Sequence, residues 1–129
     1  MAYATHAIDN SPTLYGVASA AIQNPAMLAV KFSEGKLALP SAGDSVIGIV
    51  LADQDTVAAG GALHVQIKDI CYWIAGGAIA AGDMLKTDAA GKCVKASAGE
   101  VVNAIALETG STGKPCKVMI CHTAIPAAD

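Results

Sequence analysis

The sequence predicts an all-β fold, a small β-barrel or β-sandwich, and three observations support that prediction. Short apolar runs recur between glycine-containing turns over residues 27–123, at the spacing of roughly 8–12 residues that is typical of sandwiches and barrels. Apolar and polar residues alternate through residues 62–68, which is the period of a half-buried strand. Helix signals are weak, because the one helix-like window, residues 15–23, is followed by Asn24-Pro25, and a residue before proline avoids the helical region.

Turn residues divide the chain into a series of expected strands. Residues 33–36 form a tight turn after the first apolar run, and Pro40 ends the second run. A glycine pair opens the alternating strand, and β-branched and aromatic residues favour a strand over residues 70–74. Residues 88–91 form a hairpin-type turn that ends in the glycine needed for positive φ. The expected strands are residues 27–32, 36–39, 45–51, 62–68, 70–74, 84–86, 92–95, 101–108 and 116–122.

Strand patterns are weak near both ends of the chain, which predicts three segments. Residues 1–26 are expected to form an N-terminal extended arm or a short helix. Residues 27–123 are expected to form the β domain, and residues 124–129 a tail.

Two stretches of the β domain repeat one pattern. Residues 35–51, GKLALPSAGDSVIGIVL, align without a gap to residues 91–107, GKCVKASAGEVVNAIAL. Each has a Gly-Lys turn, a short strand, a Ser-Ala-Gly-Asp/Glu turn and an apolar strand, which predicts two similar β-hairpin units. The structural turns are assigned to Gly35, Gly43, Gly91 and Gly99, because glycine enters the left-handed region at little cost. Chance matching in a chain rich in Ala, Gly and Val is the alternative interpretation.

The composition indicates an assembly rather than an isolated molecule. The chain of 129 residues is 53% hydrophobic but only 15% charged, against about 25% charged residues in an ordinary domain. Exposed apolar surface commonly marks an interaction site. The net charge is −3 and the lysines are scattered, which argues against direct nucleic-acid binding. The longest uncharged run, residues 10–30, contains two prolines, and no basic segment precedes an apolar one, so we expect neither a membrane span nor an export signal.

The motifs that suggest chemistry are incomplete, so we expect neither an enzyme nor a cofactor or metal site. The segment 110–115 resembles a phosphate-binding loop, but Glu108 occupies the place of the first glycine and Pro115 that of the hydroxyl residue. Cys116, Cys121 and His122 lack a fourth ligand, and in a strand Cys116 and His122 point to one face and Cys121 to the other. The cysteines are expected to be reduced core residues. A small hydrolase with an activated cysteine is a less favoured class.

Aromatic side chains are the candidate interface residues, because aromatics are favoured anchors in protein interfaces. Adjacent Tyr72 and Trp73 place one ring on each face of a strand. Core packing of both rings is the alternative. The candidate interface residues are Tyr72, Trp73, Tyr3 and Tyr15.

One long segment resembles a known family. Residues 79–107, IAAGDMLKTDAAGKCVKASAGEVVNAIAL, and residues 57–67, VAAGGALHVQI, are similar to the capsid cement (head decoration) proteins of tailed bacteriophages. The resemblance covers roughly residues 35–121 and consists of turns and small residues rather than a catalytic signature. It implies a small β-barrel or sandwich, made in the host cytoplasm, that binds the exterior of the capsid as a homotrimer. The implied partner is the major capsid protein, whose neighbouring subunits it bridges, with residues 1–25 as an arm.

The alternative function is a β-clip or lipoyl-like carrier or small-ligand-binding module. Such domains are also pseudo-symmetric, and they need an exposed lysine at the tip of a hairpin. Lys36 and Lys92 each follow a turn glycine, although the flanking Asp/Met-Lys-Met/Ala signature is missing. A covalent adduct on either lysine would identify a carrier.

Overall fold

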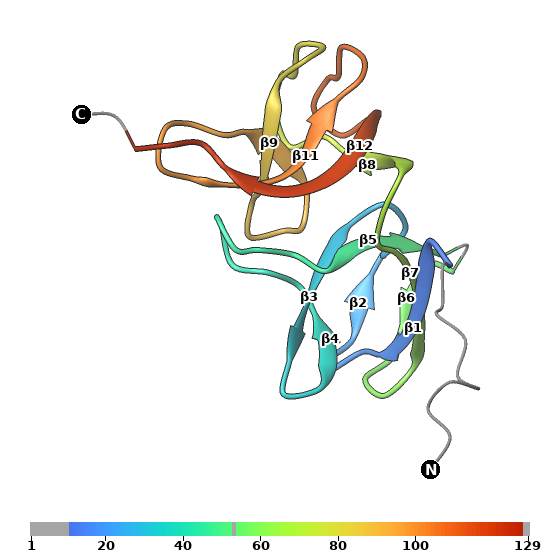
Figure 1. Cartoon of the computed structure of the whole chain (residues 1–129). Helices are drawn as coiled ribbons and strands as arrows, with labels where there is room; N and C mark the ends of the chain where they lie inside the picture. The colour runs from blue at the N-terminus through green and yellow to red at the C-terminus, as the bar shows by residue number, and fades with distance from the viewer. Residues whose placement is uncertain (1–10, 53, 128–129) are drawn as a thin grey trace.

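The computed structural model describes residues 11–52 and 54–127, which form two lobes of antiparallel strands (Figure 1). The N-terminal lobe, residues 11–67, contains β1 (Thr13–Val17), β2 (Ile22–Gln23), β3 (Ala29–Ser33), β4 (Lys36–Ala38), β5 (Gly48–Leu51), β6 (Thr56–Val57) and β7 (Ala62–Gln66). The C-terminal lobe, residues 70–127, contains β8 (Ile70–Ile74), β9 (Met84–Thr87), β10 (Cys93–Lys95), β11 (Val101–Ala106) and β12 (Pro115–Ala124). Every regular element of the described residues is a strand, so the predicted all-β class is confirmed. This part of the chain contains no helix long and apolar enough to cross a membrane.

Each lobe is built on a five-stranded sheet, and the strand order is the same in both. The N-terminal sheet runs β1-β7-β5-β3-β4, and the C-terminal sheet runs β8-β12-β11-β9-β10. Both sheets curl until their outer strands meet at one parallel bridge, Ala18 with Leu37 in the first lobe and Ala75 with Cys93 in the second. A two-stranded sheet pairs β2 with β6. Among the described strands no sheet closes fully into a barrel, so each lobe is a strongly curved open sheet.

The repeat predicted from residues 35–51 and 91–107 is present in three dimensions. Its four turn glycines have positive φ values in matching pairs: 79° at Gly35 and Gly91, and 82° at Gly43 and Gly99. These values lie in the left-handed region, where a side chain costs free energy and glycine does not. The glycines are therefore required by the backbone at the same four points of the two hairpin units.

The acidic residue after the second glycine stabilises the turn in both copies. Ser41 N donates to Asp44 Oδ2 at 2.8 Å, and Ser97 N donates to Glu100 Oε1 at 2.7 Å. Each carboxylate thus accepts a hydrogen bond from a turn amide that the strands leave unpaired. Aspartate and glutamate perform the same local task here, which explains why either residue is found at this position.

The duplication extends beyond the two predicted copies to the whole of each lobe. Ala18 N donates to Gly61 O at 2.8 Å just after β1, and Ala75 N donates to Lys114 O at 3.0 Å just after β8. Each acceptor follows a glycine with positive φ. The order of strands, the parallel bridges and these hydrogen bonds all correspond, so the lobes are two copies of one structural unit.

Each lobe has its own hydrophobic core, and the second core includes residues of the first lobe. The N-terminal core consists of Ala18, Ile22, Leu28, Val30, Leu37, Val50, Val57, Leu63 and Val65. The C-terminal core consists of Cys71, Trp73, Ala75, Ile79, Leu85, Cys93, Ala104, Ala106, Cys116 and Val118, with Ala29, Val46 and Ile49 from the N-terminal lobe. The two lobes therefore share buried surface along their contact.

Hydrogen bonds to Gly91 fix one side of the contact between the lobes. Its carbonyl oxygen accepts from Ala29 N at 2.8 Å and from the Trp73 indole nitrogen, also at 2.8 Å. Gly43 N adds a bond across the contact to Thr87 O at 3.0 Å. A β-carbon on Gly91 would lie 2.8 Å from the Ala29 carbonyl oxygen, so only glycine fits at this point of the contact.

Asn103 fixes the other side of the contact between the lobes. Its side chain is buried, its Oδ1 accepts from Val46 N at 3.1 Å, and its Nδ2 donates to Asp44 O at 3.0 Å. Both partners belong to the N-terminal lobe, and the residue at the corresponding position of that lobe is Ile47. A buried amide that is satisfied across the contact favours one particular arrangement of the two lobes.

The N-terminal segment differs from the expected arm or short helix. Its described part, residues 11–26, contributes β1, which pairs with β7, and β2, which pairs with β6. Leu14 packs against the core of the first lobe and Ile22 is buried in it. The small residues that resemble a weak helix in the sequence instead allow close packing in a sheet. Residues 1–10 lie outside the described residues.

The expected tail also continues the fold beyond its predicted start. β12 extends to Ala124, and Ile125 N then donates to Glu100 O at 3.0 Å while its carbonyl oxygen accepts from Gly99 N at 2.9 Å. This pairing makes the long arm of strand and turn that projects from the C-terminal lobe in Figure 1. Residues 128–129 lie outside the described residues.

Candidate interaction surfaces

The candidate aromatic residues occupy different environments. Trp73 is fully buried and its indole nitrogen is bonded within the lobe contact, so its assignment to an interface is corrected to a core position. Tyr72, the next residue along β8, points outward and is 47% exposed. Tyr15 is 73% exposed and stacks on His64 at 4.2 Å between ring centroids. Tyr3 lies outside the described residues.

Four apolar side chains form a row across the outer face of the C-terminal sheet, here called the C-terminal row. Adjacent strands place them in register: Ile70 pairs with Met119, Met119 with Ile105, and Ile105 with Met84. Ile70 is 56% exposed, Met84 42% and Met119 40%. An ordinary half-solvated sheet has polar residues on this face, so the row is a candidate interaction surface.

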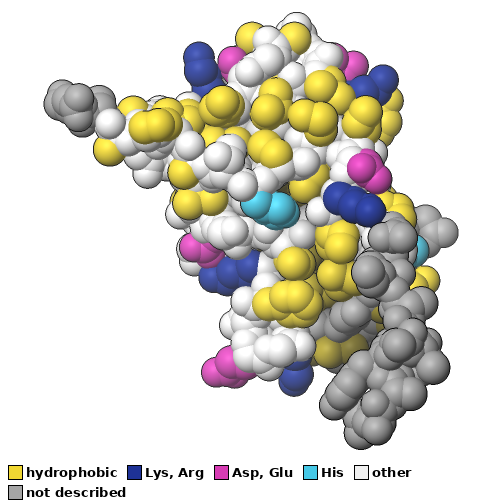
Figure 2. Space-filling model, in the orientation of Figure 1, with side chains coloured by type: hydrophobic (Ala, Val, Ile, Leu, Met, Phe, Trp, Pro, Cys, Tyr) yellow, Lys and Arg dark blue, Asp and Glu magenta, His cyan; other side chains and the backbone are white. Residues whose placement is uncertain are grey.

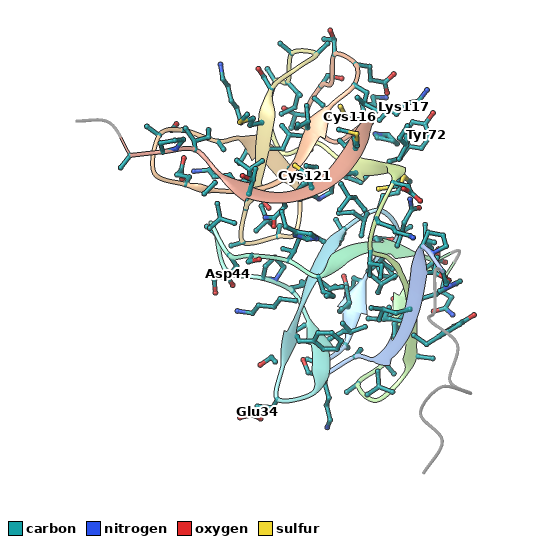
Figure 3. All side chains as sticks on the ribbon, in the orientation of Figure 1. Glu34, Asp44, Tyr72, Cys116, Lys117 and Cys121 are labelled. Carbon is teal, nitrogen blue, oxygen red and sulfur yellow. The ribbon has the colours of Figure 1, made fainter. Side chains whose placement is uncertain are left out.

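A second, shorter line of side chains lies beside the C-terminal row. Tyr72 pairs with Lys117, and Leu107 N donates to Lys117 O at 2.9 Å. Figure 3 shows Tyr72 and Lys117 side by side, pointing away from the lobe. In Figure 2 hydrophobic side chains spread across the visible face of this lobe, with most charges near its margins. The C-terminal row and this line together therefore make a mainly apolar outer face.

Sequence reasoning missed the C-terminal row, although the sequence carries a signal for it. β8 and β12 have apolar residues at both the inward and the outward positions, as in ICYWI of residues 70–74. A strand that is apolar on both faces is normally covered on both faces. The outward residues of such strands are the ones to examine when a chain is expected to assemble.

The N-terminal lobe carries its own patch, here called the Tyr15 patch. It consists of Tyr15 and Val17 on β1, His64 on β7 and Leu51 on β5. The strands pair Tyr15 with His64 and Leu51 with His64, so these side chains lie together on the outer face. Stacking holds the Tyr15 ring in place before any partner binds, which lowers the conformational entropy lost on binding.

A groove of about 670 Å³ runs between the lobes and is the candidate site for a small ligand. Its lining includes Asn24, Leu28, Ile74 and Lys92. Lys92 is half-buried here rather than exposed at a hairpin tip. This position differs from the exposed lysine that a carrier domain requires. Lys36 is exposed on β4, directly after its turn.

The cysteines of the described chain lie in environments that disfavour the reactive thiolate. Burial raises the pKa of Cys93 to about 12 and the pKa of Cys71 to about 11. Burial also raises the pKa of Cys116 and of Cys121, which Figure 3 places on the same strand, β12. Residues 11–52 and 54–127 contain no cluster of three His, Cys, Asp or Glu side chains able to hold a metal ion.

The segment that resembles a phosphate loop is part of the sheet framework. Gly110 forms a bridge with Ile79, and Lys114 N donates to Ser111 O to close the following turn. Pro115 then begins β12. A phosphate loop opens a helix whose N-terminus faces the phosphate, and here a strand follows instead.

Comparison with known proteins identifies the fold. No known protein family and no curated protein matches the sequence. Among solved structures, the N base of head fiber gp8.5 of bacteriophage phi29 superposes with a TM-score of 0.63. The two proteins share a fold. The match has 18% sequence identity and covers 84% of this chain and 92% of the other, so it includes parts of both lobes.

Proposed function

We propose that this chain is a structural protein of a bacteriophage head that binds the outer surface of the capsid. The observation that carries the proposal is the fold shared with the base of a head fiber over most of both chains. The low charge and the apolar outer faces of the two lobes support it, because they suit a protein whose function is contact area. We place no catalytic step in this function.

The finer proposal is a cement or decoration role on the capsid exterior. The chain binds the major capsid protein as a homotrimer, bridges neighbouring subunits and stabilises the shell. Binding at many equivalent sites gives a firm attachment even when each contact is weak. The resemblance of residues 35–121 to cement proteins supports this role beside the structural match.

We propose the Tyr15 patch as the surface that contacts the capsid. It combines an exposed, pre-positioned aromatic ring with apolar neighbours on adjacent strands. Buried aromatic anchors contribute most of the binding free energy in typical protein interfaces. Tyr15 stands on β1 and Tyr72 at the corresponding position of β8, so the second lobe supplies a matched control residue.

The test mixes the purified chain with DNA-filled heads of the phage that encodes it and measures co-sedimentation. We expect binding that saturates, and imaging of the heads should show added density at threefold or quasi-threefold positions. Tyr15→Ala should weaken binding by about 30-fold, which corresponds to a hot-spot residue. Tyr72→Ala should change it by less than about threefold, with self-association measured separately. Absence of co-sedimentation, or equal effects of both substitutions, would contradict the proposal.

A further inference from the structure

The C-terminal row has a structural counterpart in the first lobe, here called the N-terminal row. Its members are Thr13, Gln66, Ile49 and Ala29, and the strand register links them in that order. The C-terminal row links Ile70, Met119, Ile105 and Met84 through the corresponding strands in the same order. The two rows are therefore the same surface of the same structural unit.

The second lobe covers part of the N-terminal row. Ala29 and Ile49 are fully buried and belong to the core cluster of the C-terminal lobe. Ala29 N is also bonded to Gly91 O across the contact. Thr13 and Gln66 are polar and belong to neither core cluster, and Gln66 Nε2 donates to the Ile70 carbonyl oxygen at 2.8 Å, at the start of the second lobe. In the first lobe, then, this surface is apolar where the core of the second lobe covers it and polar outside that core.

The C-terminal row departs from that rule in the single chain. All four of its residues are apolar, and three of them are at least 40% exposed. Within the described residues no further lobe covers them, because residues 101–127 continue the second sheet itself. The row therefore has the apolar composition of a surface that another lobe covers, although no lobe of the described residues covers it.

The first lobe carries the matching half of such a contact. In the second lobe, the residues that dock onto the first lobe include Thr87 and Asn103. Their counterparts in the first lobe are Phe32 and Ile47. Phe32 is 51% exposed, and a hollow lined by Phe32, Val46, Ile47, Ser45 and the Lys31–Asp44 ion pair opens at this end of the lobe. This end presents the apolar Phe32 and Ile47 beside an ion pair, and Phe32 is left half exposed by the described residues.

We propose that the C-terminal row of one copy binds the Phe32 end of the N-terminal lobe of a second copy. The contact repeats between chains the contact that the two lobes make within a chain. It joins two different surfaces, so it is a head-to-tail contact that closes into a ring when the rotation allows. A ring of three chains would be the homotrimer of the proposed function. The number three rests on that proposed function. The pairing of the two surfaces is independent of capsid binding.

The test uses the full chain without capsids and two variants that block opposite surfaces. Met119→Glu places a charge in the C-terminal row, and Phe32→Glu places one in the docking end. Val17→Glu is the control, because Val17 is 40% exposed, as Met119 is, and belongs to neither surface. Sedimentation velocity over a range of concentrations measures the mass of each species, and thermal unfolding verifies that each variant is folded.

We expect the unsubstituted chain and Val17→Glu to self-associate and each blocking variant alone to be monomeric. An equimolar mixture of the two blocking variants should form dimers and nothing larger, because only one productive pair of surfaces remains. A monomeric unsubstituted chain would overturn the proposal. So would a Phe32→Glu variant that assembles normally, since the row would then bind itself or another protein. If the unsubstituted chain self-associates but does not bind DNA-filled heads, only the proposed function would be contradicted.

Discussion

The two lobes share one topology but differ in what covers their outer faces. The first lobe has its Ala29 and Ile49 covered by the second, whereas at the same places of the second lobe Met84 is exposed and Ile105 is only half-buried. The turns that build the lobes have stayed the same, down to matching φ values at their glycines. The backbone geometry of the turns is therefore the same in both copies. The polarity of the side chains on each outer face differs with whether another lobe covers that face.

The interiors of the lobes differ in a compensating way. Gly16 of β1 corresponds to Trp73 of β8, and Leu37 of β4 corresponds to Cys93 of β10. A β-carbon on Gly16 would lie 2.6 Å from a methyl carbon of Leu37, so the leucine occupies the space beside the glycine. In the second lobe the large residue, Trp73, is on β8 and the small one, Cys93, is on β10, which is the reverse of the first lobe. Cores tolerate such exchanges when total volume is preserved.

The largest expected difference in the effect of one substitution on stability is between the corresponding residues Gly91 and Gly35. Both have a φ of 79°, but a β-carbon on Gly91 would meet the Ala29 backbone, whereas one on Gly35 would meet nothing within 4 Å. Gly35→Ala should lower the free energy of unfolding by about 1 kcal/mol, the conformational cost alone. Gly91→Ala should lower it by about 3 kcal/mol, because two hydrogen bonds to its carbonyl are also disturbed.

Denaturant unfolding of the two glycine variants measures this difference directly. The Gly35→Ala variant is the matched control, since it contains the same substitution at the same φ. Equal losses of stability would mean that the lobe contact at Gly91 is not formed as described. The comparison between the lobes would then have no structural basis at this point.

A smaller difference is expected between Asn103 and its counterpart Ile47. Asn103→Ala leaves Val46 N and Asp44 O without their partner at the lobe contact, which should cost about 2 kcal/mol of unfolding free energy. Ile47→Ala removes a half-buried side chain at an uncovered end and should cost about 1 kcal/mol. Stability measured in denaturant, with hydrogen exchange of the Val46 amide as the local readout, distinguishes the two. Unchanged protection of that amide in Asn103→Ala would contradict the assignment.

The parts of this structure that sequence predicts are those controlled by a few neighbouring residues. The turns of residues 35–51 and 91–107 follow from glycine and a nearby carboxylate, so their repetition is visible in the sequence. The equivalence of β1 and β8 is not visible there, because TLYGV and ICYWI share little and only strand order and register relate them.

Candidate surface residues were harder to predict than the turns. Alternation along residues 70–74 indicates that Tyr72 and Trp73 point to opposite faces, but it leaves open which face is inside. That choice depends on the curvature of the sheet and on the packing of the first lobe. Asn103 carried a readable signal, since it interrupts an apolar strand where the aligned copy has Ile47. Its hydrogen-bond partners lie 57 and 59 residues away in the sequence, so no pattern of neighbouring residues predicts them.

The smallest expected effect concerns the ion pairs that the two copies share. Lys31 pairs with Asp44 at 2.7 Å, and Lys86 pairs with Glu100. The lysine in each pair, followed by the turn serine amide, holds the pKa of the carboxyl below its ordinary value. A lowered pKa means that the folded state favours the ionised carboxylate. This contribution to stability is present above the ordinary carboxyl pKa and is lost as pH falls through the folded pKa.

The thermal midpoint of the unsubstituted chain should therefore decrease as the pH falls through and below the ordinary carboxyl range. Asp44→Asn combined with Glu100→Gln should flatten that part of the pH profile. Glu34→Gln, at the outer tip of the first lobe (Figure 3), removes a charge away from both turns and serves as the control. Because each carboxylate accepts from one lysine and one turn serine amide, Asp44→Asn alone and Glu100→Gln alone should each flatten the profile in part and by similar amounts. A single substitution that leaves the profile unchanged would mean that the carboxylate of that turn does not stabilise the fold as described.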